Sequence, residues 1–216
     1  MTHRYRGGLY REIGKPSNRW SQNSQGMRIY IVGGPGSGKT SLGLSLSRRL
    51  GLPLLQLDEM WGQLFARDPD GGIAEATREF RKGLVAGYVA RASWVIEGAE
   101  PPFLDAFAEV SDLIVWCDVP FIVAASRMIR RHVIADLRGN NRYPGYGRLY
   151  GFLRSVHGRY AEEPDLLDGP WTTWTRARVA AGAERHQRKV VRIGIGSAQQ
   201  SLATILRTLR SRPQRF

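Results

Sequence analysis

The sequence predicts an α/β fold in which helices cover both faces of a parallel β-sheet. Short apolar segments rich in β-branched and aromatic residues alternate along the chain with longer segments of helical periodicity. The first apolar segment, 29–32, reads Ile-Tyr-Ile-Val and ends at a glycine-rich turn, as a strand buried on both faces of a parallel sheet does. Ligands of such a sheet bind at the carboxyl ends of its strands.

Composition limits the domain organisation and the compartment. A chain of 216 residues suits one α/β domain, and its single cysteine, Cys117, lies in an apolar run and is expected in the core. No disulfide framework is available and no apolar run approaches the ~18 residues of a membrane span, so we expect a cytoplasmic protein without membrane segments. The net charge of +13 suits nucleic acid, an anionic membrane surface or phosphorylated small molecules equally.

Five strands and five helices can be placed from the apolar patterns. Residues 139–151 are dense in turn formers and tyrosines and are expected to form a mobile surface excursion. Residues 1–26 show no periodicity and are expected to form a flexible basic arm before a domain over 27–216. The strands are expected at 29–32, 53–57, 94–96, 113–117 and 190–193, and the helices at about 38–50, 73–90, 101–107, 121–137 and 199–210.

The turn after the first strand carries the most specific motif. Gly33, Gly38, Lys39 and Thr40 match G-x-x-x-x-G-K-[ST], the phosphate-binding loop. Glycines let the backbone N–H groups curl toward an anion, and the helix that follows adds further N–H donors. We therefore expect ATP and Mg²⁺ as cofactors, with the nucleotide held by Gly33, Gly34, Pro35, Gly36, Ser37, Gly38, Lys39, Thr40 and Ser41.

Two side chains of this loop have separate expected roles. Lys39 supplies a cation for the β- and γ-phosphates, and the Thr40 hydroxyl is the expected Mg²⁺ ligand. Acidic residues stand just past other strands, at Asp58, Glu97 and Asp118. Asp118 precedes Val119 and Pro120, so we expect it to cap the helix that begins near Phe121.

The order of these motifs resembles the small P-loop kinases, the adenylate kinase, shikimate kinase and gluconate kinase group. It looks closest to bacterial members labelled topology modulation protein or adenylate kinase-related. The resemblance spans about 27–209 and rests on the loop, on L-Q-L-D-E-M-W around Asp58, on W-V-I-E-G at 94–98, on D-L-I-V-W-C-D-V-P at 112–120 and on the arginine-rich helix that follows.

The resemblance implies a three-layer P-loop NTPase fold of the nucleoside/nucleotide kinase type, with strand order 2-3-1-4-5 and a lid over about 127–160. It implies transfer of the ATP γ-phosphoryl group to a small-molecule acceptor, with nucleosides or nucleotides first among the candidates. It places Asp58 near the acceptor hydroxyl or the metal, and transition-state arginines at Arg127 and Arg131. Glu97 could hold a Mg²⁺-bound water or the acceptor, and Trp61, with Phe65 one turn later, could line an acceptor pocket.

The face pattern of 121–137 bears on the two arginines. At 100° per residue Arg127, Arg131 and Arg138 lie together, and we expect the opposite side, with Ile122, Ala125, Ile129 and Val133, to be core. A solvated basic face would show the same pattern. His132, His157 and His186 lack metal-ligand spacing, and we assign them no chemistry.

Two other classes of function remain open. One is a P-loop ATPase that grips nucleic acid through 1–26 and the arginines of 207–215; the other is a nucleotide-binding regulator without turnover. A GTPase is disfavoured because N-K-x-D is absent from the sequence, and an ABC-type ATPase because L-S-G-G-Q is absent.

Overall fold

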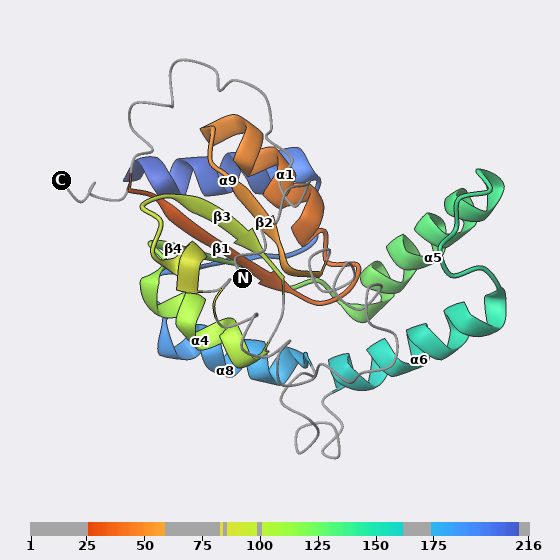
Figure 1. The fold of residues 1–216 in the computed structure, drawn as a ribbon. Helices are drawn as coiled ribbons and strands as arrows, with labels where there is room; N and C mark the ends of the chain where they lie inside the picture. Colours follow the sequence, from red (N-terminus) through yellow and green to blue (C-terminus); the bar gives the residue numbers. More distant parts are fainter. Residues whose placement is uncertain (1–25, 59–82, 84–85, 99–100, 162–173, 212–216) are drawn as a thin grey trace, which may run out of the picture.

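Figure 1 shows a computed structural model of the chain, which describes residues 26–58, 83, 86–98, 101–161 and 174–211. These residues contain a five-stranded parallel sheet in the order β2-β3-β1-β4-β5, which confirms the predicted strand order. The strands are β1 (Arg28–Gly33), β2 (Leu54–Gln56), β3 (Trp94–Glu97), β4 (Leu113–Cys117) and β5 (Val190–Ile193).

The register of the central strand β1 decides which residues share the functional edge. Ile31 of β1 lies opposite Glu97 of β3, and Gly33 lies opposite Cys117 of β4. All strands run in the same direction, so their carboxyl ends form one edge of the sheet. The phosphate-loop motif, Glu97 and the residue after Cys117 are therefore gathered at this edge.

Two pairs of helices cover the sheet, one pair on each face (Figure 1). Alternate residues of β1 point to opposite faces, so Ile29 and Ile31 pack in one core and Tyr30 and Val32 in the other. The first core takes leucines of α1 and Ile205 of α9, and the second takes Phe107 of α4 and Val179 of α8. The bounds are α1 (Lys39–Leu50), α9 (Ala198–Ser211), α4 (Pro101–Val110) and α8 (Arg176–Arg185).

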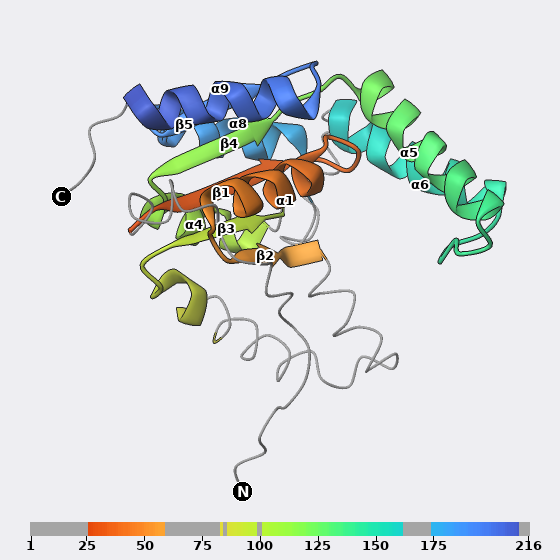
Figure 2. The same ribbon diagram turned by 90° about the horizontal axis from the view of Figure 1, so that it is seen from above.

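Between β4 and β5, α5 (Phe121–Leu137) runs outward from the sheet and α6 (Tyr146–Ala161) returns toward it (Figure 2). We call this pair the α5–α6 arm. A small apolar cluster at its base joins Ala124, Ala125 and Met128 of α5 to Val156 of α6. The arm lies where the resemblance implies a lid, over about 127–160. Its closure as a lid stays a prediction.

Residues 139–151 lie mostly at the surface, as expected, but α6 begins at Tyr146, so the second half of this segment is helical. Leu149, Leu153, Val156 and Tyr160 follow one another at helical spacing, and the last three pack into or against the cluster at the base of the arm. That periodicity outweighs the glycines at 147 and 151, around which a Cβ atom would meet open space.

Other expectations on elements differ less. The helix expected over 101–107 extends to Val110, and those expected over 38–50 and 199–210 match α1 and α9 within one residue. Most of the helix expected over 73–90 lies outside the described residues; of its described part, 86–89 are helical. In the described part of the chain, no helix combines the length and apolar character needed to cross a membrane.

Candidate functional site

The phosphate loop lies between β1 and α1, with Gly38 as the N-cap of α1. Gly36 shows why a glycine is needed here. Its φ is +75°, a left-handed conformation, and a Cβ atom on it would lie 2.5 Å from the carbonyl oxygen of Ala124 in α5. The base of the α5–α6 arm therefore packs directly on the back of the loop.

The carbonyl oxygens and the N–H groups of the loop backbone have different partners. The carbonyl oxygens of Gly36 and Ser37 accept from the Arg127 guanidinium, at 3.4 and 3.0 Å, and that of Pro35 accepts from the Tyr160 hydroxyl at 3.4 Å. Among the described residues, no backbone carbonyl accepts from the N–H groups of Lys39 or Thr40 at the start of α1. The first turn of α1 therefore offers donors to an anion.

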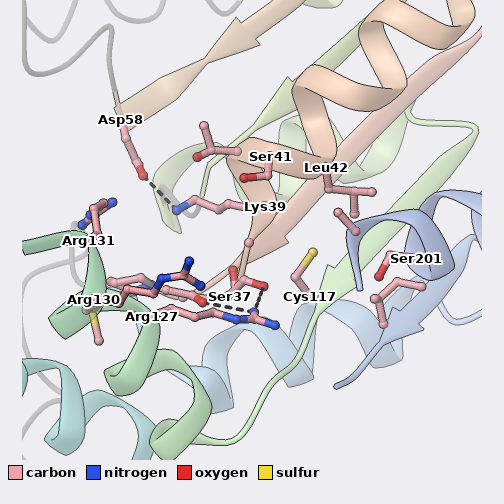
Figure 3. A pocket seen from close by; sticks show the side chains of 18 of the residues that line it. Ser37, Lys39, Ser41, Leu42, Asp58, Cys117, Arg127, Arg130, Arg131 and Ser201 are labelled. Carbon is pink, nitrogen blue, oxygen red and sulfur yellow. Dashed lines mark hydrogen bonds and ion pairs between the residues drawn. The ribbon is translucent and has the colours of Figure 1, made fainter. Parts of the chain in front are cut away.

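Lys39 is buried, and its ammonium group lies 2.9 Å from a carboxylate oxygen of Asp58 (Figure 3). Asp58, two residues beyond β2, has a side chain that is 57% exposed. The structure thus joins two residues that the sequence placed at the ends of different strands. The Asp58 carboxylate is therefore the anionic partner of the loop lysine, and more than half of its side chain stays open to solvent.

Glu97 lies at the end of β3 and is 1% exposed. Its Oε1 accepts from the Thr40 hydroxyl at 3.0 Å and from the Gln56 amide at 3.1 Å, whereas its Oε2 is buried without a hydrogen-bond partner. Burial raises the pKa of Glu97, although nearby Lys39 and the Gln56 hydrogen bond oppose this. Gln56 was missed from the sequence because a partner of Glu97 is recognisable only once β2 is paired with β3.

These residues fit a magnesium ion. Mg²⁺ prefers oxygen ligands and keeps several of its waters, which carboxylates then bind. The hydroxyl of Thr40 and the orphaned Oε2 of Glu97 supply such oxygen atoms beside the loop. Among the described residues, no group of three or more histidine, cysteine, aspartate or glutamate side chains could hold a metal ion.

Arg127 and Arg131 both face the loop from α5, together with Arg130 (Figure 3). The expected apolar face opposite them was only partly right. Ala125 is buried, but Ile122 is 73% exposed and Ile129 is 42% exposed. The buried residues of α5 are Ala124, Ala125 and Met128, because the arm projects from the sheet and the apolar cluster that joins α5 to α6 lies at its base.

A cavity of about 1000 Å³ extends from the loop to the end of β5. Of the described residues that line it, five are basic and one is acidic: Lys39, Arg127, Arg130, Arg131 and Arg138 against Asp58. Its far end is formed by small residues of the turn between β5 and α9, among them Gly194, Gly196 and Ser197. The basic residues suit the charged part of a large anion, and the small residues at the far end leave room for a flat, less polar part.

Asp118 does not cap α5, contrary to expectation. The N-cap of α5 is Pro120, without a side-chain cap, and Asp118 is buried between Arg176 of α8 and Arg192 of β5. Arg176 Nε and Arg192 Nε each donate to it at 2.8 Å. Burial raises the pKa of Asp118, but the hydrogen bonds from the two arginines outweigh this and hold it below its ordinary value.

Trp61 and Phe65 fall outside the described residues. Cys117 is buried as expected, and burial raises the pKa of its thiol to about 12, so it is no thiolate nucleophile.

A scan against protein-family models and a search of curated proteins both found no match. Solved structures do match. Shikimate kinase from Acinetobacter baumannii in complex with shikimate is 17% identical, with a TM-score of 0.53, over 88% of this chain and 97% of that one. An uncharacterized protein from Eubacterium ventriosum is 14% identical, with a TM-score of 0.50, over 86% and 99%. At these identities the similarity shows the fold alone.

Proposed function

We propose that this chain is a Mg²⁺-dependent kinase that transfers the γ-phosphoryl group of ATP to a small-molecule acceptor, with nucleosides and nucleotides first among the candidates. The observation that carries the proposal is the Lys39–Asp58 pair at 2.9 Å beside a cavity lined by arginines from α5. A cation for the phosphates, a carboxylate for the acceptor and arginines for the transferring group are the parts that phosphoryl transfer needs.

Lys39 and Asp58 divide the work at the reacting end of the site. The Lys39 ammonium binds the β- and γ-phosphates in place of the Asp58 carboxylate that it contacts in this structure. Asp58 is then released to orient the acceptor hydroxyl and take its proton. The exposure of Asp58 leaves room for an acceptor beside it.

Thr40 and Glu97 are the proposed magnesium-binding residues. When bound, Mg²⁺ neutralises charge on the phosphates. The Thr40 hydroxyl would be a direct ligand of the ion, and Oε2 of Glu97 would hold one of its waters. Gln56 and Thr40 both donate to Oε1, so they hold the carboxylate in the orientation that leaves Oε2 available.

Arg127 and Arg131 are the proposed transition-state residues on α5. A guanidinium can bridge two oxygens of a transferring group, a geometry that an ammonium does not reproduce. In this structure Arg127 donates to the carbonyl oxygens of Gly36 and Ser37 in the loop, and it also lines the cavity. Arg131 is exposed and lines the cavity.

The experiment that tests this proposal compares ADP release from MgATP with a panel of small molecules and with single- and double-stranded nucleic acids. A kinase responds to one small molecule or a few related ones. Stimulation by nucleic acid alone would favour a nucleic-acid-dependent ATPase. ATP binding without turnover under either condition would favour a regulator, and both outcomes would overturn the proposal.

A further inference from the structure

Behind the phosphate loop, Gly34 rests against the indole ring of Trp174. A Cβ atom on Gly34 would lie 2.6 Å from Cζ2 of Trp174 and closer still to Cη2, and its three nearest atoms all belong to that ring. Gly34 has an ordinary backbone conformation, with no positive φ. Its lack of a side chain is therefore explained by contact with Trp174, which lies 140 positions later in the chain.

Trp174 is held in place by its neighbours. It is 6% exposed and belongs to the apolar core between the sheet and α4 and α8. The next residue, Thr175, is fully buried and caps α8 by accepting from the Arg178 N–H at 3.2 Å. A ring that is buried in the core and followed directly by a helix cap is a rigid support for the loop.

Tyr160 connects this support to the α5–α6 arm. Its ring lies 5.1 Å from that of Trp174 and 5.7 Å from that of Phe121, which opens α5. Its hydroxyl donates to the Pro35 carbonyl oxygen at 3.4 Å. Burial raises the pKa of Tyr160 to about 12, so the hydroxyl keeps the proton that it donates throughout the physiological pH range.

We propose that Trp174 and Tyr160 are positioning residues that hold the phosphate loop in its anion-binding conformation and couple that conformation to the position of α6. Trp174 supports Gly34 from behind, and Tyr160 turns the Pro35 carbonyl away from the phosphates. Neither residue lines the nucleotide cavity, so both act through the loop. The inference rests on the proposed function only in requiring that the loop binds a nucleotide.

A double-mutant cycle between Gly34 and Trp174 tests whether the Trp174 ring supports the loop at Gly34. Affinity for MgADP is measured by calorimetry for wild type, Gly34→Ala, Trp174→Leu and the double variant. We expect Gly34→Ala to weaken binding about tenfold or more, and Trp174→Leu in the same chain to recover part of the loss because the obstructing ring is gone. Wild-type affinity in Gly34→Ala, or strictly additive losses in the double variant, would overturn the support by Trp174.

Tyr160→Phe tests whether the Tyr160 hydroxyl positions the loop. This test remains possible if the Trp174 variants fail to fold. The substitution keeps both ring contacts and removes one donor. We expect MgADP affinity to fall about threefold and the ³¹P shift of the bound β-phosphate to move, with little change in melting temperature. Tyr150→Phe, at an exposed tyrosine of the same helix, is the matched control and should change neither.

The outcomes separate the two proposals. A wild-type chain that binds no nucleotide contradicts the proposed function and this inference together. A wild-type chain that binds MgADP, with unchanged affinity and phosphorus shift in Tyr160→Phe, overturns the role of Tyr160 and leaves the kinase proposal intact.

Discussion

Asp58 carries the central step of the proposed chemistry. It pairs with Lys39 in this structure, and we propose that it orients the acceptor hydroxyl once the phosphates bind Lys39. We predict that Asp58→Asn lowers the phosphoryl-transfer rate by about 10² to 10⁴, the usual value of a general base. ATP affinity should stay the same or tighten, because the carboxylate competes with the phosphates for Lys39 in this structure. Single-turnover kinetics with the acceptor found in the panel, and calorimetry with ATP, measure the two effects.

The control for Asp58→Asn is Glu109→Gln, which changes an exposed acid on α4. It should leave both quantities at wild-type values. If Asp58→Asn transfers at the wild-type rate, Asp58 is only a partner of Lys39 in the free protein.

We predict that the buried carboxyl group of Glu97 makes the folding stability of the chain depend on pH. Its folded-state pKa is raised above the ordinary 4.5, so the folded chain holds the proton more tightly than the unfolded chain. The stability that this gives is complete below pH 4.5 and is lost as pH rises through the raised value. Glu97→Gln removes the titration and keeps an acceptor oxygen for Thr40 and Gln56.

The melting temperatures of Glu97→Gln and wild type, measured without Mg²⁺ from pH 4 upward, should therefore diverge with rising pH, the variant becoming the more stable. Lys39 and Asp58 also face this carboxyl group, so the same series in Asp58→Asn serves as a control. A constant difference between wild type and Glu97→Gln at all pH values would contradict the prediction.

Among the helices, α5 carries the two proposed transition-state arginines, Arg127 and Arg131. Their substitution tests whether this helix takes part in catalysis or only supports the fold. Arg131→Lys and Arg127→Lys keep the charge and lose the planar donors. We predict that at least one lowers the transfer rate by about 10³ or more, as expected of an arginine that acts on the transition state. Arg148→Lys, on an exposed position of α6 outside the cavity, is the matched control.

Losses below about threefold in both α5 variants, with normal melting temperatures, would make this helix ordinary scaffold, because exposed charges contribute little.

The Asp118 cluster joins three elements, since its carboxylate on the end of β4 binds Arg192 of β5 and Arg176 of α8. We predict that Asp118→Asn lowers the free energy of unfolding by about 2 kcal/mol at neutral pH. A broken buried pair costs more, but the arginine side chains are 37% and 60% exposed and solvent screens them.

The pH dependence of this loss has a definite sign. The folded pKa of Asp118 is lowered, so its stabilisation is present above the ordinary value of 3.8 and lost as pH falls through the lowered value. Urea denaturation at pH 7 and pH 2.5 should show the difference from wild type shrinking in acid. An equal difference at both values would contradict an ionised Asp118.

Across the whole molecule, the resemblance to the small P-loop kinases implied the strand order, and local sequence patterns predicted the parallel sheet, the phosphate loop and the position of the functional residues at the carboxyl ends of the strands. They did so because each depends on residues close in sequence and on the general geometry of parallel sheets. What they missed depends on long-range packing. The contact of Gly34 with Trp174, the pairing of Asp118 with Arg176 and the exposure of Ile122 all follow from where α5, α6 and α8 lie.

The central claim, transfer of a phosphoryl group to a small molecule, is tested most directly by incubating the chain with MgATP and a metabolite mixture and searching by mass spectrometry for metabolites that gain one phosphoryl group. We predict one product or a few related ones, absent with Lys39→Ala, whose loop lacks the phosphate-binding cation. A chain that binds ATP yet yields no phosphorylated metabolite, or Lys39→Ala forming the product at the wild-type rate, would contradict the account.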